Sequence, residues 1–94
     1  MTKNKNSQEL VAKYRQEKTD FLDSLQPDDF RNGSSFNQVE TIIDELNEGA
    51  YHAALDKKDP QEFIKKAATH LFREDSPMAE KLLELARSYL KMKR

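Results

Sequence analysis

The stretch DPQEFIKKAATHLF (residues 59–72) carries the clearest folding signal in this sequence. Asp59 can cap a helix, Pro60 suits the first helical turn, and Glu62 completes the capping pattern. Apolar residues then recur at helical spacing, at Phe63, Ile64, Ala67, Ala68, Leu71 and Phe72. The stretch therefore predicts an amphipathic helix over residues 60–74.

Similar punctuation marks the helices on either side. Downstream, Ser76-Pro77 repeats the start signal and predicts a helix over residues 77–92. Upstream, Ser35 and Gln38 form a capping box for a helix over residues 36–58. Gly49 lies inside that helix, where a glycine costs ~1 kcal/mol relative to alanine. Three roles are open for this glycine: it is tolerated without consequence, it kinks the helix, or it lets a neighbouring element approach closely.

The first helix is expected over residues 7–26. Asn6 is its capping residue, and Pro27 ends it because the residue before a proline is pushed out of the α region. Its apolar stripe is interrupted at Glu17 and Lys18, which predicts looser packing at that point. Residues 1–5 are polar and are expected to be disordered.

Four helices with no segment of strand periodicity indicate an all-α fold. The short connections after the second and third helices favour antiparallel neighbours. We therefore expect one domain over residues 1–94, folded as an antiparallel four-helix bundle whose first helix is the least certain. No sustained heptad is present, so the oligomeric state stays open.

The composition excludes several classes of protein. The chain has no cysteine, no run of 18 or more apolar residues and no signal peptide, which together favour a cytoplasmic location. A net charge of −1 argues against nucleic acid as a partner. The basic end at Lys91, Lys93 and Arg94 supports at most a peripheral contact with a membrane.

The residues needed for chemistry are missing or badly spaced. His52 and His70 are the only histidines, and neither belongs to a zinc-binding pattern. The two glycines are isolated, so no phosphate-binding loop is expected. Asp28-Asp29 lacks the ligand spacing of a calcium loop. We expect no cofactor, no metal and no enzymatic activity.

Uneven charge and stray aromatic residues mark the candidate contact sites. Glu40, Asp44 and Glu48 are spaced by four residues, and like charges at this spacing repel one another. This acidic strip is either compensated within the fold or faces a cationic partner. Lysines and arginines of the first helix (Lys13, Arg15 and Lys18) or the third (Lys65 and Lys66) would provide the compensation.

Two aromatic residues complete the candidate partner-binding set. Phe30 lies in the longest loop, where it is either a plug on the bundle or an exposed anchor for a partner. Tyr89 lies on the last helix, which is the other candidate face.

The run VETIIDELNEGAYHAALDKKDPQEFIKKAATHL (39–71), followed by AEKLLELARSYL (79–90), resembles the immunity proteins of bacteria that make pediocin-like bacteriocins, of the enterocin A immunity type. The likeness covers residues 36–90 and rests on helix lengths, the Asp-Pro junction and a leucine-rich last helix. It implies a cytoplasmic four-helix bundle that protects its producer from a cationic bacteriocin bound to a membrane permease. Many family members are more basic and have a longer tail, whereas this chain stops at Arg94.

Two functional hypotheses follow. The first is a small cytoplasmic binding protein that confers immunity to a cationic bacteriocin. The second is an interaction or regulatory protein of the kind encoded by phages or plasmids, an inhibitor or adaptor that acts by protein–protein contact. Both expect a protein or peptide partner.

Overall fold

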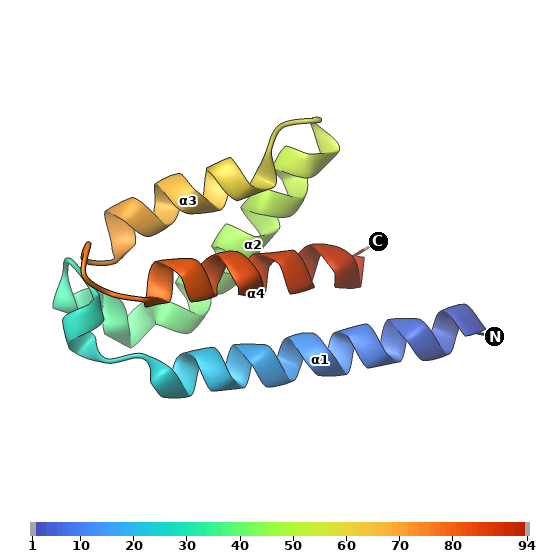
Figure 1. Ribbon diagram of the computed structural model, residues 1–94, viewed down its shortest axis with the longest axis horizontal. Coiled ribbons are helices and arrows are strands. Elements are labelled where there is room, and N and C mark those ends of the chain that lie inside the picture. The colour runs from blue at the N-terminus through green and yellow to red at the C-terminus, as the bar shows by residue number, and fades with distance from the viewer. Residues whose placement is uncertain (1, 94) are drawn as a thin grey trace.

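The structure is a computed structural model that describes the backbone of residues 2–93 and the side chains from Gln8 to Lys93. Its four α-helices pack as an antiparallel bundle, so the predicted all-α fold is confirmed (Figure 1). The helices are α1 (Thr2–Ser24), α2 (Val39–Leu55), α3 (Pro60–Leu71) and α4 (Met78–Lys93). Two short 3₁₀ helices, η1 (Pro27–Asp29) and η2 (Gly33–Gln38), lie between α1 and α2.

The first helix starts earlier than predicted. It begins at Thr2 rather than residue 7, so residues 2–5 are helical and Asn6 lies inside the helix, while Met1 lies outside the described residues. Neither glycine nor proline interrupts this region, and nothing else in it stops a helix. The far end follows the prediction more closely: α1 ends at Ser24, and Gln26 is extended ahead of Pro27 (φ −122°, ψ 151°).

The start of α2 corrects a second expectation. Ser35 lies within η2, and Gln38, which occupies the N-cap position of α2, makes no capping hydrogen bond with its side chain. The cap is made earlier, where the Asn32 side chain accepts a hydrogen bond from Ser34 N at 3.1 Å. The chain therefore winds into a 3₁₀ helix first and reaches α-helical geometry only at Val39.

The starts of α3 and α4 use the predicted caps. Asp59 Oδ1 accepts from Gln61 N at 2.9 Å, and Ser76 Oγ accepts from Met78 N at 3.1 Å. Both middle helices end earlier than predicted, at Leu55 rather than 58 and at Leu71 rather than 74. In α3 the reason is that Phe72 turns extended to pair with Phe30.

Phe30 closes one end of the bundle. Its side chain is only 3% exposed, and its ring lies 5.1 Å from that of Phe72 and 6.0 Å from that of Phe36. The plug is therefore the arrangement observed, and the exposed anchor is not. Backbone hydrogen bonds from Arg31 N to Leu71 O (3.0 Å) and from Arg73 N to Asp29 O (2.9 Å) fasten this loop to the end of α3.

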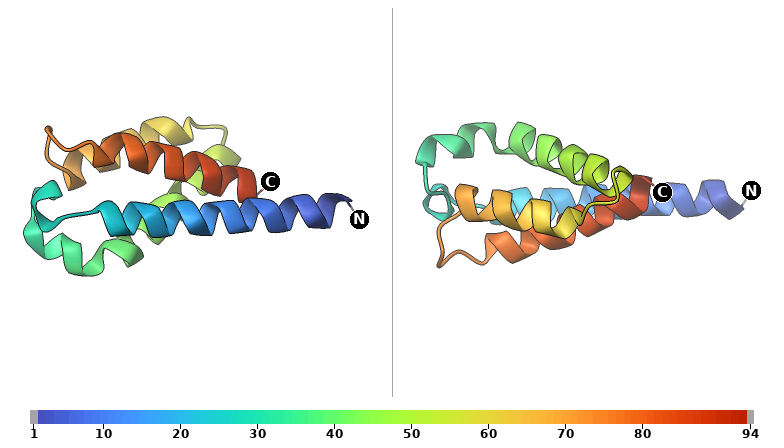
Figure 2. Two further views of the ribbon diagram at one scale, coloured as in Figure 1. Left: turned by 60° about the horizontal axis from the view of Figure 1, so that its bottom comes forward. Right: turned by 90° about the horizontal axis from the view of Figure 1, so that it is seen from above.

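The first helix packs mainly along α4. The two run antiparallel side by side, and the N-terminal turns of α1 extend past the end of α4 (Figure 2). Tyr14 and Phe21 of α1 enter the common core, as does Leu25 just after the helix. The pairing of α1 with α4 creates the main surface feature described below.

Candidate partner-binding surface

The acidic strip of α2 is compensated within the fold. Lys18 Nζ of α1 lies 2.8 Å from Asp44 Oδ1 and 3.8 Å from Glu40 Oε2. At the other end, Lys93 Nζ of α4 lies 3.7 Å from Glu48 Oε2. Lys18 was among the predicted compensating cations, whereas Lys93 was not. These cations offset the repulsion within the strip and reduce the field that it presents to a partner.

Tyr89 is engaged by the same strip. Its hydroxyl donates a hydrogen bond to Glu48, while the Lys93 ammonium sits over the rings of Tyr89 and Tyr51, 5.5 and 5.6 Å from their centroids. Burial, together with the neighbouring Glu48 carboxylate, raises the pKa of Tyr89 well above its ordinary value. The hydrogen bond from Tyr89 in turn lowers the pKa of Glu48. The structure thus ties Tyr89 to the fold.

The interrupted stripe of α1 marks its polar contacts with two other helices. Lys18 reaches Asp44 on α2, while Glu17 Oε2 accepts a hydrogen bond from Ser88 Oγ on α4 at 2.7 Å. Burial lowers the pKa of Lys18, but the hydrogen bond and charge of Asp44 outweigh it, so the net shift is upward. Specific polar contacts therefore occupy the interruption of the stripe, and Glu17 also lines the cleft described below.

One buried polar residue, Asn47, was not predicted from the sequence. Asn47 is fully buried, and its Nδ2 donates to Tyr14 OH at 2.7 Å across α1 and α2. Desolvation raises the pKa of Tyr14. A signal existed, because Asn47 lies four residues after Ile43 and three before Ala50, which places it on the apolar face of α2.

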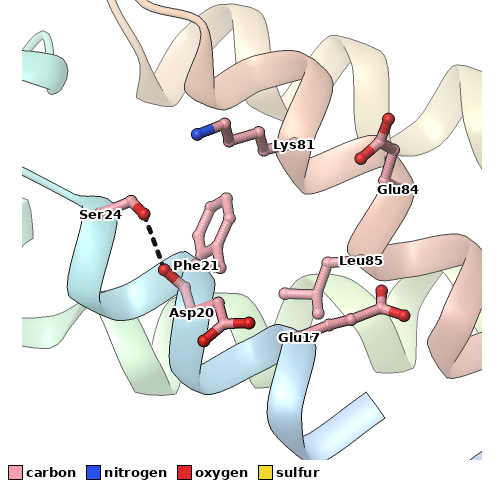
Figure 3. Close-up of a pocket in the computed structure, with 7 residues that line it drawn as sticks. All are labelled: Glu17, Asp20, Phe21, Ser24, Lys81, Glu84 and Leu85. Carbon is pink, nitrogen blue, oxygen red and sulfur yellow. Dashed lines mark hydrogen bonds between the residues drawn. The ribbon is translucent and has the colours of Figure 1, made fainter. Parts of the chain in front are cut away.

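A cleft of about 360 Å³ opens between α1 and α4 (Figure 3). The buried side chains of Phe21 and Leu85 form its floor. The remaining lining residues are polar: Glu17, Asp20 and Ser24 from α1, and Lys81 and Glu84 from α4. We call this the α1–α4 cleft.

The polar residues of the α1–α4 cleft carry three carboxylates and one ammonium group. Asp20 Oδ1 accepts from Gln16 Nε2 at 3.0 Å, and Glu17 is held by Ser88. Within residues 8–93 no ion pair engages Glu84. An apolar floor under an acidic rim suits a lysine or arginine, whose aliphatic stem packs on carbon while its charged head reaches carboxylate oxygens.

The sequence analysis missed this cleft because its lining combines residues of α1 with residues of α4, which lie far apart in the chain. The predicted contact residues Glu40, Asp44, Glu48, Phe30 and Tyr89 do not line it. The first three and Tyr89 share the α1–α2–α4 polar contacts, and Phe30 lies in the core. The break in the α1 stripe at Glu17 was the signal that pointed toward it.

The comparisons with protein-family models, curated proteins and solved structures produced no match. In the described part of the chain, no three acidic or histidine side chains are grouped so that they could hold a metal ion. None of the described helices has the length and apolar character needed to cross a bilayer.

Proposed function

We propose that this chain is a small cytoplasmic binding protein whose α1–α4 cleft receives a cationic side chain of a protein or peptide partner. The observation that carries the proposal is the pairing of a buried apolar floor, Phe21 and Leu85, with a rim of three carboxylates and one lysine. A complementary charge on the partner would speed association, and the apolar floor would favour a side chain with a long carbon stem.

Charge reversal within the cleft tests the proposal. The probe is a blocked peptide rich in lysine and leucine, titrated into the labelled protein and followed by amide chemical shifts. We expect shifts along the helix turns that carry Phe21 and Leu85, and weaker binding by Glu84→Lys and Asp20→Lys. Glu45→Lys is the matched control, because Glu45 is an exposed carboxylate of α2 outside the cleft. Equal binding by all three variants would contradict the proposal.

Immunity to a cationic bacteriocin is the specific form of this function that we favour. Two observations support it: the antiparallel four-helix bundle that the family resemblance implies, and a contact site of the charge that a cationic peptide complements. The α2 strip no longer supplies that argument, because Lys18 and Lys93 compensate it.

A killing assay separates immunity from other contact functions. The chain is expressed in a strain sensitive to pediocin-like peptides, with Glu84→Lys and Glu45→Lys beside it. We expect protection by the wild type and by Glu45→Lys, and reduced protection by Glu84→Lys. Unchanged killing by a panel of such peptides would refute immunity. If the cleft still bound the cationic peptide, the chain would be an inhibitor or adaptor.

A further inference from the structure

A second hollow, of about 440 Å³, lies at the turn between α2 and α3. Its apolar lining comes from Ala54 and Leu55 at the end of α2, Pro60 at the start of α3, and Leu90 of α4. Tyr51 and the turn lysines Lys57 and Lys58 complete the lining. We call it the lysine hollow; no residue is common to it and the α1–α4 cleft.

Leu55 is the most exposed large apolar residue that the structure describes. Its side chain is 60% exposed, and the next, Phe63, is 39% exposed. Phe63 is accounted for, because its ring lies against Gly49 of α2. Leu55 lines the hollow beside Leu90, where an apolar group of a partner would remove both from water.

The backbone of Lys57 is unusual. It is the one non-glycine residue with positive φ (62°) in residues 2–93. Lys57 N donates to Ala54 O at 3.1 Å and Lys58 N donates to Ala53 O at 2.8 Å, the pair of bonds that closes a helix around a left-handed residue. Glycine adopts that conformation without steric cost, whereas lysine is strained there. The left-handed conformation thus ends the helix, and the residue that adopts it is one of the two lysines that line the hollow.

The charged side chains that line the hollow are both cationic. The turn also holds Asp56 and Asp59, but neither lines the hollow, and Asp59 is occupied in capping α3. The complement of this surface is therefore an anionic group joined to an apolar one.

We propose that the lysine hollow binds an acidic peptide segment of a protein partner. A bulky apolar side chain of the segment enters between Leu55 and Leu90, and its flanking carboxylates meet Lys57 and Lys58. A recessed site fits a side chain from a partner better than it fits a bilayer, since a bilayer takes up apolar groups that project. This site goes beyond the cationic contact proposed above, from which it differs in place and in charge.

The test titrates a blocked pentapeptide, Glu-Glu-Phe-Glu-Glu, into the labelled full-length chain. We expect shift changes at residues 51–60 and at Leu90, and little change along α1. Lys58→Glu should weaken binding by at least about fivefold, the effect of one charge contact at a wet surface. Lys66→Glu, an exposed lysine of α3 away from the hollow, is the matched control and should bind as the wild type does.

Lys57→Gly gives a sharper readout. Because glycine relieves the left-handed strain, this variant should unfold at higher urea concentration and yet bind the pentapeptide more weakly. The proposal is overturned if Lys57→Gly binds unchanged, if a Lys-Lys-Phe-Lys-Lys peptide shifts the same residues equally, or if no shifts occur. Retention of the chain on phosphatidylglycerol vesicles without peptide binding would assign the hollow to a membrane instead. Glu84→Lys, a variant of the α1–α4 cleft, should leave this titration unchanged. A failure of the proposal for the lysine hollow can therefore be distinguished from a failure of the proposal for the α1–α4 cleft.

Discussion

At the scale of single residues, Asn47 and Tyr14 form the one fully buried side-chain hydrogen bond among residues 8–93. Asn47 Nδ2 donates to Tyr14 OH, and Asn47 Oδ1 has no partner among the described residues. A buried polar group that loses its partner costs about 1–3 kcal/mol, whereas replacing both partners by apolar groups is close to neutral. The hydrogen bond between them therefore helps to position α1 on α2, while the unpaired Asn47 Oδ1 lowers the stability of the fold.

We expect Tyr14→Phe to lower the free energy of unfolding by about 1–3 kcal/mol, because it leaves the Asn47 amide without its acceptor. The double variant Tyr14→Phe with Asn47→Leu should recover most of that loss. Urea denaturation followed by circular dichroism measures both. A double variant no more stable than Tyr14→Phe alone would show that the buried amide is not the source of the cost.

Glu48 links stability to pH. The hydrogen bond from Tyr89 lowers the pKa of Glu48 below its ordinary value of 4.5. Since the pKa is lowered in the folded state, the stabilisation is present above pH 4.5 and is lost as the pH falls through the folded-state value. We expect Glu48→Gln to unfold at lower urea concentration than the wild type at neutral pH, with the difference narrowing in acid. Glu45→Gln, on the same helix, is the control, and a pH-independent difference would contradict this account.

At the scale of the elements, Gly49 sets the approach of α3 to α2. A Cβ placed on Gly49 would lie 2.5 Å from Cζ of the Phe63 ring, closer than carbon atoms can approach. Of the three roles that the sequence left open for this glycine, the structure therefore assigns the close neighbour. The Phe63 ring occupies the space that a side chain at position 49 would fill.

A double-mutant cycle tests this contact. Gly49→Ala alone should destabilise the protein, because the Phe63 ring must move. In a Phe63→Ala background the clash is absent, and Gly49→Ala should then stabilise by up to about 1 kcal/mol through its helix propensity. Urea midpoints of the four proteins give the coupling. The same effect of Gly49→Ala in both backgrounds would remove Phe63 as the reason for the glycine.

Local signals predicted these elements where the cause is itself local. Asp59 and Ser76 cap the helices they were expected to cap, and Pro27 holds Gln26 out of the α region. The predicted start of α2 was wrong because Asn32, three residues upstream of Ser35, caps the 3₁₀ helix η2 ahead of it. Local capping patterns do not show which of two competing caps forms.

The contact surfaces were harder to predict, because they depend on which helices pack together. The spacing of the acidic strip predicted a need for compensating cations, and Lys18, one of those named, pairs with Asp44. Lys93, which reaches Glu48 from the far end of the chain, was beyond any local pattern. The α1–α4 cleft exists only because Glu17 and Asp20 meet Lys81 and Glu84 when α1 packs along α4.

At the scale of the whole molecule, one end of the bundle is closed by segments from three parts of the chain. Phe30 of the loop after α1, Phe36 of η2 and Phe72 at the end of α3 meet through their aromatic rings. Polar contacts surround them: Arg31 Nε donates to Thr69 O at 2.7 Å, and Ser76 Oγ donates to Asp29 Oδ1 at 3.0 Å. Because these contacts connect residues far apart in the chain, their loss should affect the whole bundle.

We therefore expect Phe30→Ala to lower the free energy of unfolding by about 3–5 kcal/mol, the usual cost of removing a buried phenylalanine. A chain of 94 residues has a total stability of roughly 5–14 kcal/mol, so this variant should be partly unfolded at low urea concentration. Phe63→Ala is the matched control: the same atoms are removed from a ring that is 39% exposed, and the loss should be less than half as large. Equal losses at the two positions would contradict the assignment of Phe30 as the residue that closes this end of the bundle.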